Sequence, residues 1–234
     1  MKKRNLRAPF LIVNVKSYVY GEKVIALAKA ADEIAQRYDI DILFTTQPID
    51  AVAVIQTCKH LFVTAQTMDG IVPGRGMGHV LPEALKEAGV EAVVLNHAEC
   101  PKTVTEVAMA VERAKEVGLL SIVCADTPAQ CAMLAQLHPD VMICEPSSLI
   151  GTGTTSNADY IFTTNRVIRE IDPHIQIMQA AGVKNGDDVY QMIMWGADGS
   201  GGTSGIVKAK DPNAVMEDMA KALQRAKQKR EELQ

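Results

Sequence analysis

The sequence predicts an α/β protein in which parallel strands close into a (β/α)8 barrel, as a single domain over residues 1–234. Short runs rich in β-branched residues alternate with longer segments of helical periodicity along the whole chain, without a linker. Aromatic residues make up only 4% of the chain, so aliphatic side chains must build the core, which is typical of a buried parallel sheet. Eight strand–helix units leave about 29 residues each, close to the smallest size for such a unit. A doubly wound open sheet is the alternative.

The predicted strands are apolar runs of about six residues, each followed by polar or glycine-rich sequence, as expected of strands buried on both faces. They span residues 10–15, 41–46, 61–66, 91–96, 120–125, 140–145, 174–179 and, with the weakest pattern, 199–207. Strands that alternate with helices in this way run parallel and are joined by right-handed crossovers.

The segments between the strands carry apolar residues at spacings of three and four, which is the period of an amphipathic helix. Val24, Leu27 and Ala31 share one face of the first helix for this reason. Capping residues and glycines mark the boundaries of the helices. They predict helix starts at Asp50, Thr127–Pro128 and Asp211–Pro212, and helix ends at Gly89, Gly118 and Gly196.

Composition and charge exclude several classes of function. With 47% apolar and 22% charged residues, the chain is neither disordered nor collagen-like. The net charge of −4 argues against nucleic acid or a membrane surface as a partner, because phosphate backbones require concentrated positive charge. No apolar run is long enough for a signal peptide or a membrane span, and five widely spaced cysteines predict neither a disulfide framework nor a zinc site. We therefore expect a cytoplasmic protein.

In a βα barrel the active site lies at the carboxyl ends of the strands, and polar residues follow four of the predicted strands. Asn14 and Lys16 follow the first strand, His97 the fourth and Glu145 the sixth, and residues 199–205 form a glycine-rich stretch at the eighth. His97 alone is more typical of a structural histidine, whereas a carboxylate that ends a buried strand must be paired, hydrogen-bonded or used. A base, an imidazole, a cation and loops that hold phosphate together suit proton abstraction beside the carbonyl of a small phosphorylated substrate.

Four motifs occur in an order that a known family shares. They are NVKSY at 14–18, LNHAE at 95–99, CEPSSLIGTG at 144–153 and AGV at 181–183, and residues 65–89 and 203–212 extend the match. The chain resembles the triosephosphate isomerases, specifically their shorter archaeal-type branch, over nearly its whole length. The resemblance implies a TIM barrel that interconverts dihydroxyacetone phosphate and D-glyceraldehyde 3-phosphate through an enediolate, with no cofactor and no metal.

The resemblance also assigns roles to individual residues. Glu145 matches the base, His97 the electrophile that polarises the carbonyl, Lys16 the cation that favours the enediolate, and Asn14 a neighbour that positions the substrate. Residues 146–153 match a mobile lid that shields the intermediate from water. The implied phosphate contacts are Ile150, Gly151, Gly182, Thr203 and Ser204, with Gly201 and Gly202 as the alternative to the last two.

Three departures from the family pattern leave other functions open. Ala98 stands where the family usually has serine, Ser147 and Ser148 replace residues of a proline-rich hinge, and Met77 replaces a threonine at the tip of loop 67–80. Fewer prolines predict a looser hinge, because each proline removes a free backbone torsion. The alternatives are an isomerase of a tetrulose phosphate and a paralogue that binds sugar phosphate without catalysis. A Schiff-base aldolase requires a lysine where this chain has Glu145.

The resemblance implies assembly into a homodimer or a homotetramer. In this family the third loop inserts into a neighbouring subunit, and residues 67–80 occupy that position. The loop is too long and too rich in glycine to be convincing as a free-standing surface loop.

Overall fold

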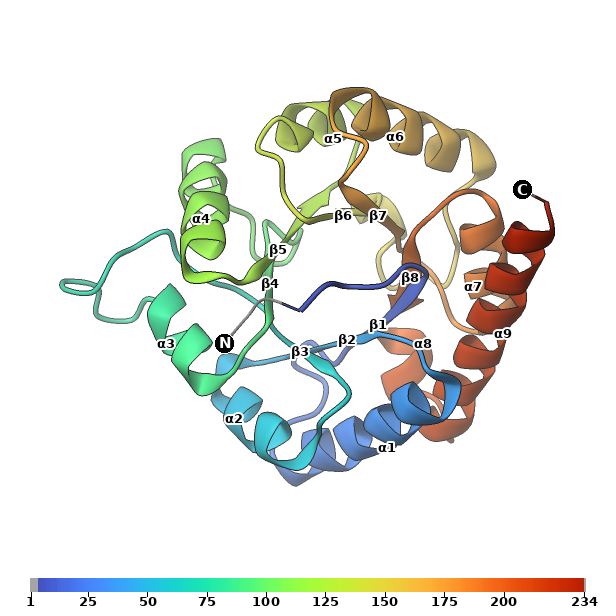
Figure 1. Ribbon diagram of the computed structural model, residues 1–234, viewed down its shortest axis with the longest axis horizontal. Coiled ribbons are helices and arrows are strands. Elements are labelled where there is room, and N and C mark those ends of the chain that lie inside the picture. The colour runs from blue at the N-terminus through green and yellow to red at the C-terminus, as the bar shows by residue number, and fades with distance from the viewer. Residues whose placement is uncertain (1–3, 234) are drawn as a thin grey trace.

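A computed structural model describes residues 4–233, so residues 1–3 and 234 of the predicted domain lie outside the described part. Eight parallel strands form a closed barrel in chain order, and helices surround it (Figure 1). The strands are β1 (Phe10–Asn14), β2 (Ile42–Thr46), β3 (Phe62–Ala65), β4 (Ala92–Leu95), β5 (Leu120–Ala125), β6 (Val141–Cys144), β7 (Gln176–Gln179) and β8 (Gly199–Gly202). Because β1 pairs with β8 as well as with β2, the barrel prediction is confirmed and the open sheet is excluded.

Helices follow the strands as the periodicity predicts. They are α1 (Glu22–Tyr38), α2 (Pro48–Thr57), α3 (Pro82–Ala88), α4 (Val104–Val117), α5 (Pro128–Ala135), α6 (Ala158–Ile171), α7 (Gly186–Met194), α8 (Ser204–Val207) and α9 (Pro212–Glu232), with a 3-10 turn, η1 (Ser147–Leu149), after β6. None of the helices within residues 4–233 is both long and apolar enough to cross a bilayer. The loop between β3 and α3 extends away from the barrel (Figure 1).

Most of the predicted helix boundaries are confirmed. Thr127 caps α5 by accepting a hydrogen bond from the Gln130 amide, and Gly89 and Gly118 end their helices in the left-handed conformation that favours glycine. The predicted start at Asp50 is wrong, because α2 begins two residues earlier at Pro48. The Asp50 carboxylate instead accepts a hydrogen bond from the backbone of Gly21, at 3.2 Å.

The prediction for the eighth strand was too long, because β8 ends at Gly202 and residues 204–207 form α8. The glycines of β8 let β1 approach closely and so close the barrel. A Cβ atom on Gly199 would lie 2.3 Å from the Phe10 ring, and one on Gly201 would lie 2.2 Å from the Ile12 carbonyl oxygen. Close packing against β1 therefore explains a sequence that is unusual for a strand interior.

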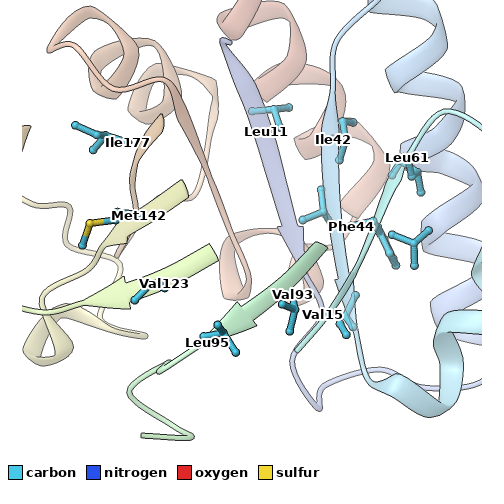
Figure 2. Close-up of a cluster of buried hydrophobic side chains, with 14 of the residues drawn as sticks. Leu11, Val15, Ile42, Phe44, Leu61, Val93, Leu95, Val123, Met142 and Ile177 are labelled. Atoms are coloured by element: carbon cyan, nitrogen blue, oxygen red, sulfur yellow. The ribbon is translucent and has the colours of Figure 1, made fainter. Parts of the chain in front are cut away.

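Side chains on alternate strand positions form two hydrophobic layers. One layer lies between the barrel and its helices, and Figure 2 shows part of it, including Leu11, Ile42 and Phe44. The other layer contains Phe10, Ile12 and the facing side chains of the other strands. On β1 this alternation places Asn14 on the same face as Phe10 and Ile12, which directs it toward the axis of the barrel.

Candidate active site

A cavity of about 180 Å³ opens at the carboxyl ends of the strands. Its floor consists of barrel side chains such as Ile12, Val94, Ile143 and Met178. Every residue that the sequence assigned to the site lines it: Asn14, Lys16, His97, Glu145, Ile150, Gly151, Gly182, Thr203 and Ser204. Gly201 and Gly202 line it too, so the two alternative pairs at β8 border the same space. The tertiary structure thus brings together residues from five separate parts of the chain.

Lys16 reaches the cavity through an unusual backbone conformation. Its φ of 46° lies in the left-handed region, which costs a residue with a side chain on the order of 1 kcal/mol. Two hydrogen bonds hold it there: the Lys16 amide donates to Asn14 Oδ1 at 2.9 Å, and Gln66 Nε2 donates to the Lys16 carbonyl at 2.8 Å. Strain of this kind, held by its surroundings, is typical of functional sites.

The ammonium of Lys16 is paired with a carboxylate that the sequence analysis did not assign to the site. Lys16 Nζ lies 2.7 Å from Glu99 Oε1, and the Lys16 side chain is 15% exposed while that of Glu99 is 57% exposed. Glu99 belongs to the same motif as His97, and this proximity was the only signal available in the sequence. The pair holds the Lys16 side chain at the wall of the cavity.

His97 is held in a defined tautomer by the main chain. The Glu99 amide donates to His97 Nδ1 at 3.1 Å, so Nδ1 must be an acceptor. A neutral imidazole then carries its proton on Nε2. The preceding residue, Asn96, is fixed at a φ of 59° by donating to the Cys124 carbonyl and accepting from the Lys102 amide. These bonds aim a hydrogen-bond donor, His97 Nε2, into the cavity.

Glu145 follows β6 and faces His97. Its amide donates to the Ala125 carbonyl at 2.9 Å, which extends the pairing of β5 with β6 by one residue. Glu145 Oε2 lies 3.5 Å from His97 Nε2, and the two side chains are 16% and 13% exposed. A carboxylate and an imidazole N–H thus lie side by side in a partly desolvated cavity, within reach of adjacent atoms of one small substrate.

Glycines allow two of the loops that line the cavity to come close together. Gly182 has a φ of 68°, and a Cβ atom there would lie 2.0 Å from the Thr154 carbonyl oxygen. The same atom on Gly202 would lie 2.9 Å from the Val183 carbonyl oxygen. The segment 146–153 therefore ends directly against the loop after β7. A second contact that the sequence analysis missed reinforces this end, because Lys184 Nζ donates to the Gly153 carbonyl at 3.1 Å.

Cys124 and Cys144 lie in the core, as their positions in strands predict. Both are buried, and their Sγ atoms do not line the cavity of Glu145 and His97. Burial raises the pKa of the Cys124 thiol, and a hydrogen bond with Cys131 raises the pKa of Cys144. Neither thiol is therefore a ready nucleophile. Within residues 4–233 no three His, Cys, Asp or Glu side chains are grouped closely enough to hold a metal ion.

Comparison with known proteins is consistent with this geometry. The family model for triosephosphate isomerase matches residues 9–223. A triosephosphate isomerase of Methanosarcina mazei is 35% identical over 217 residues, which cover 91% of this chain and 97% of that protein. Those of Sulfurisphaera tokodaii and Sulfolobus acidocaldarius are each 32% identical, and the matches cover 91% and 97% of this chain and 94% and 100% of theirs.

Proposed function

Because this chain belongs to the triosephosphate isomerase family, we propose that it interconverts dihydroxyacetone phosphate and D-glyceraldehyde 3-phosphate. The observation that carries the proposal is the placement of the Glu145 carboxylate 3.5 Å from His97 Nε2, in a cavity that Lys16 also lines. A base and a hydrogen-bond donor at this separation fit the two neighbouring carbons of an α-hydroxy carbonyl compound.

The reaction needs only proton transfers. Glu145 removes a proton from the carbon that carries the hydroxyl group, and the electron pair moves to the carbonyl oxygen to give an enediolate. His97 Nε2–H donates to that oxygen, and the ammonium of Lys16 stabilises the negative charge. His97 then moves a proton between the two oxygens, and Glu145 returns its proton to the neighbouring carbon. Substrate and product are isomers, so the balance requires no cofactor.

The phosphate end of the substrate is assigned to the glycine-rich loops. Gly151, Gly182 and residues 201–204 line the same cavity as Glu145, and glycines, which lack side chains, let backbone N–H groups approach phosphate oxygens. The positive charge of Lys16 favours entry of an anionic substrate despite the net charge of −4. Residues 146–153 act as the lid that excludes water from the enediolate.

The other functions that the sequence left open are not favoured. The end of β6 provides Glu145 and not the lysine that a Schiff-base aldolase needs. The replacement of a family serine by Ala98 removes none of the groups that perform the proposed chemistry. The replacements at Ser147 and Ser148 also remove none of these groups. No observation therefore supports a tetrulose phosphate isomerase or a non-catalytic paralogue.

We extend the proposal to assembly and location. The loop between β3 and α3 exposes two apolar side chains, Val72 at 60% and Met77 at 101%, which a second copy of the chain would cover. A homodimer or a homotetramer is expected, and elution from a sizing column as a monomer would contradict it. The free cysteines among the described residues support a reducing compartment, and so the cytoplasm.

A coupled assay of triose phosphate isomerisation tests the proposed function. Replacing Glu145 with aspartate withdraws the carboxylate by about 1 Å, and misplacement on this scale lowers kcat by about 100-fold. The matched control is Glu112→Asp, which makes the same change at an exposed position of α4 and should leave kcat unchanged. Near wild-type kcat in Glu145→Asp would exclude Glu145 as the base. A panel of three- and four-carbon ketose phosphates measures the substrate length, and a preference for tetrulose phosphates would favour the alternative.

A further inference from the structure

Asp126, the residue that follows β5, is hydrogen-bonded to the start of the lid and to the helix that follows the lid. The hydroxyl of Ser147, at the start of η1, donates to the Asp126 carboxylate. The hydroxyl of Tyr160, in the first turn of α6, donates to the Asp126 main-chain carbonyl at 2.6 Å. Ser147 lies at the start of the lid and Tyr160 in the helix that follows it, so a single residue outside the lid contacts the lid and the helix after it.

Asp126 is itself held by the barrel. Its amide donates to Gln130 Oε1 in the first turn of α5 at 2.9 Å. The residue before it, Ala125, ends β5 and accepts the hydrogen bond from the amide of Glu145. Two adjacent residues therefore hold the lid and the proposed catalytic base. Asp126 contacts the hinge of the lid, and Ala125 contacts Glu145. A group fixed on a strand end in this way positions its partners more accurately than a group on a loop.

Hydrogen bonds, and not close packing, hold the hinge on this side. A second cavity of about 420 Å³ lies beside it, lined by Ala98, Asp126, Glu145 and Ser147 among others. The Ser147 side chain is exposed, so few van der Waals contacts restrain it. At the other flank burial raises the pKa of Tyr160, which keeps its hydroxyl protonated as a donor. The serine that replaces a hinge proline thus introduces a side-chain restraint in place of a backbone one.

We propose that Asp126 is a positioning residue that fixes the lid relative to Glu145 through Ser147 and Tyr160. The consequence for catalysis rests on the proposed function. An enediolate that is exposed when the lid loosens loses phosphate: its electron pair forms a carbon–carbon double bond while the carbon–oxygen bond to the phosphate breaks. The phosphate leaves with the bonding electrons, and a three-carbon enol aldehyde remains. A secured lid therefore lowers the ratio of phosphate released to triose phosphate isomerised.

The test compares four single variants by two measurements. Ser147→Ala and Asp126→Ala remove the bond at the entry of the lid, whereas Asp126→Asn keeps a neutral oxygen that accepts from Ser147. Ser148→Ala is the control for exchange, because it removes the same hydroxyl at the adjacent exposed position of η1. Hydrogen exchange is followed at the amides of η1 and the residues after it, and released inorganic phosphate is measured per isomerisation event.

The expected result is that Ser147→Ala and Asp126→Ala each raise exchange at these amides and the phosphate ratio by about tenfold. Asp126→Asn should remain close to wild type in both measurements. Ser148→Ala should remain close to wild type in hydrogen exchange. Wild-type exchange and phosphate ratio in both alanine variants would overturn the proposal. Failure of the proposed function is distinguishable, because a wild-type protein without isomerase activity would still show the exchange difference. Thermal unfolding of each variant identifies a general loss of structure.

Discussion

Gly182 offers a test of the proposed phosphate site, and the effect of the substitution can be worked out from the structure. A methyl group at this position would lie 2.0 Å from the Thr154 carbonyl oxygen, 2.3 Å from its carbonyl carbon and 2.8 Å from the Thr155 nitrogen. All three atoms belong to the backbone, so no side chain can rotate away. Gly182→Ala must therefore move the end of the lid, the loop after β7, or both.

Two effects of different size follow from this substitution. A displacement of about 1 Å or more at the lid should lower kcat/KM by about 100-fold, because the groups around the phosphate no longer converge. Alanine at a φ of 68° also costs about 1–2 kcal/mol of folding free energy, since its Cβ approaches the following carbonyl. For a chain of this size that penalty lowers the unfolding midpoint by roughly 2–8 °C.

A matched variant separates the two effects. Gly153 has a φ of 75°, and a Cβ atom there would have none of the described residues within 4 Å. Gly153→Ala therefore carries the backbone penalty without the collision, and its kcat/KM should fall by only a few fold. The coupled assay gives kcat/KM, and thermal unfolding gives the midpoint. Equal losses of kcat/KM in both variants would show that the collision at Gly182 has no effect of its own. An unchanged kcat/KM in Gly182→Ala would show that Gly182 does not belong to the phosphate site.

Two further predictions concern stability. Burial alone would raise the pKa of Asp69, but hydrogen bonds from the Val80 amide and from Lys102 outweigh it and hold the pKa below its ordinary value of 3.8. The ionised carboxylate then stabilises the fold above this value, and the contribution is lost as the pH falls through the lowered pKa. Asp69→Asn should therefore lower the free energy of unfolding at pH 7 and make it fall less steeply as the pH is lowered. Denaturant unfolding at several pH values measures both effects. The same fall at low pH in the variant and the wild type would contradict this prediction. Gly199→Ala places a Cβ atom 2.3 Å from the Phe10 ring, and such overpacking costs about 1–3 kcal/mol, which a lowered unfolding midpoint reports. An unchanged midpoint would show that the ring moves freely.

The sequence was sufficient to predict the order of the elements, and the residues that it assigned to a site line one cavity. Hydrophobic period and capping residues are local properties, so the eight strand–helix units could be found without tertiary information. The position of Glu145, at the end of an apolar run, follows from the same pattern. The errors were also local: at Asp50 an acidic first-turn residue resembled a cap, and at residues 204–207 a short helix followed a glycine-rich strand.

Only the tertiary structure decided which distant residues meet. Lys16 and Glu99 are separated by 83 residues, and their contact depends on the stagger of the strands around the barrel. The same is true of Asp126, which follows β5 and accepts hydrogen bonds from Ser147 and Tyr160 of the next strand–helix unit.

The glycines of β8 show the same division between sequence and tertiary structure. As a pattern they weaken the prediction of a strand, yet they become necessary once β8 must pair with β1 and make room for Phe10. Local sequence thus determined the elements and their order along the chain. Barrel closure decided the contacts, because the distance between residues far apart in the chain is a property of packing and not of periodicity.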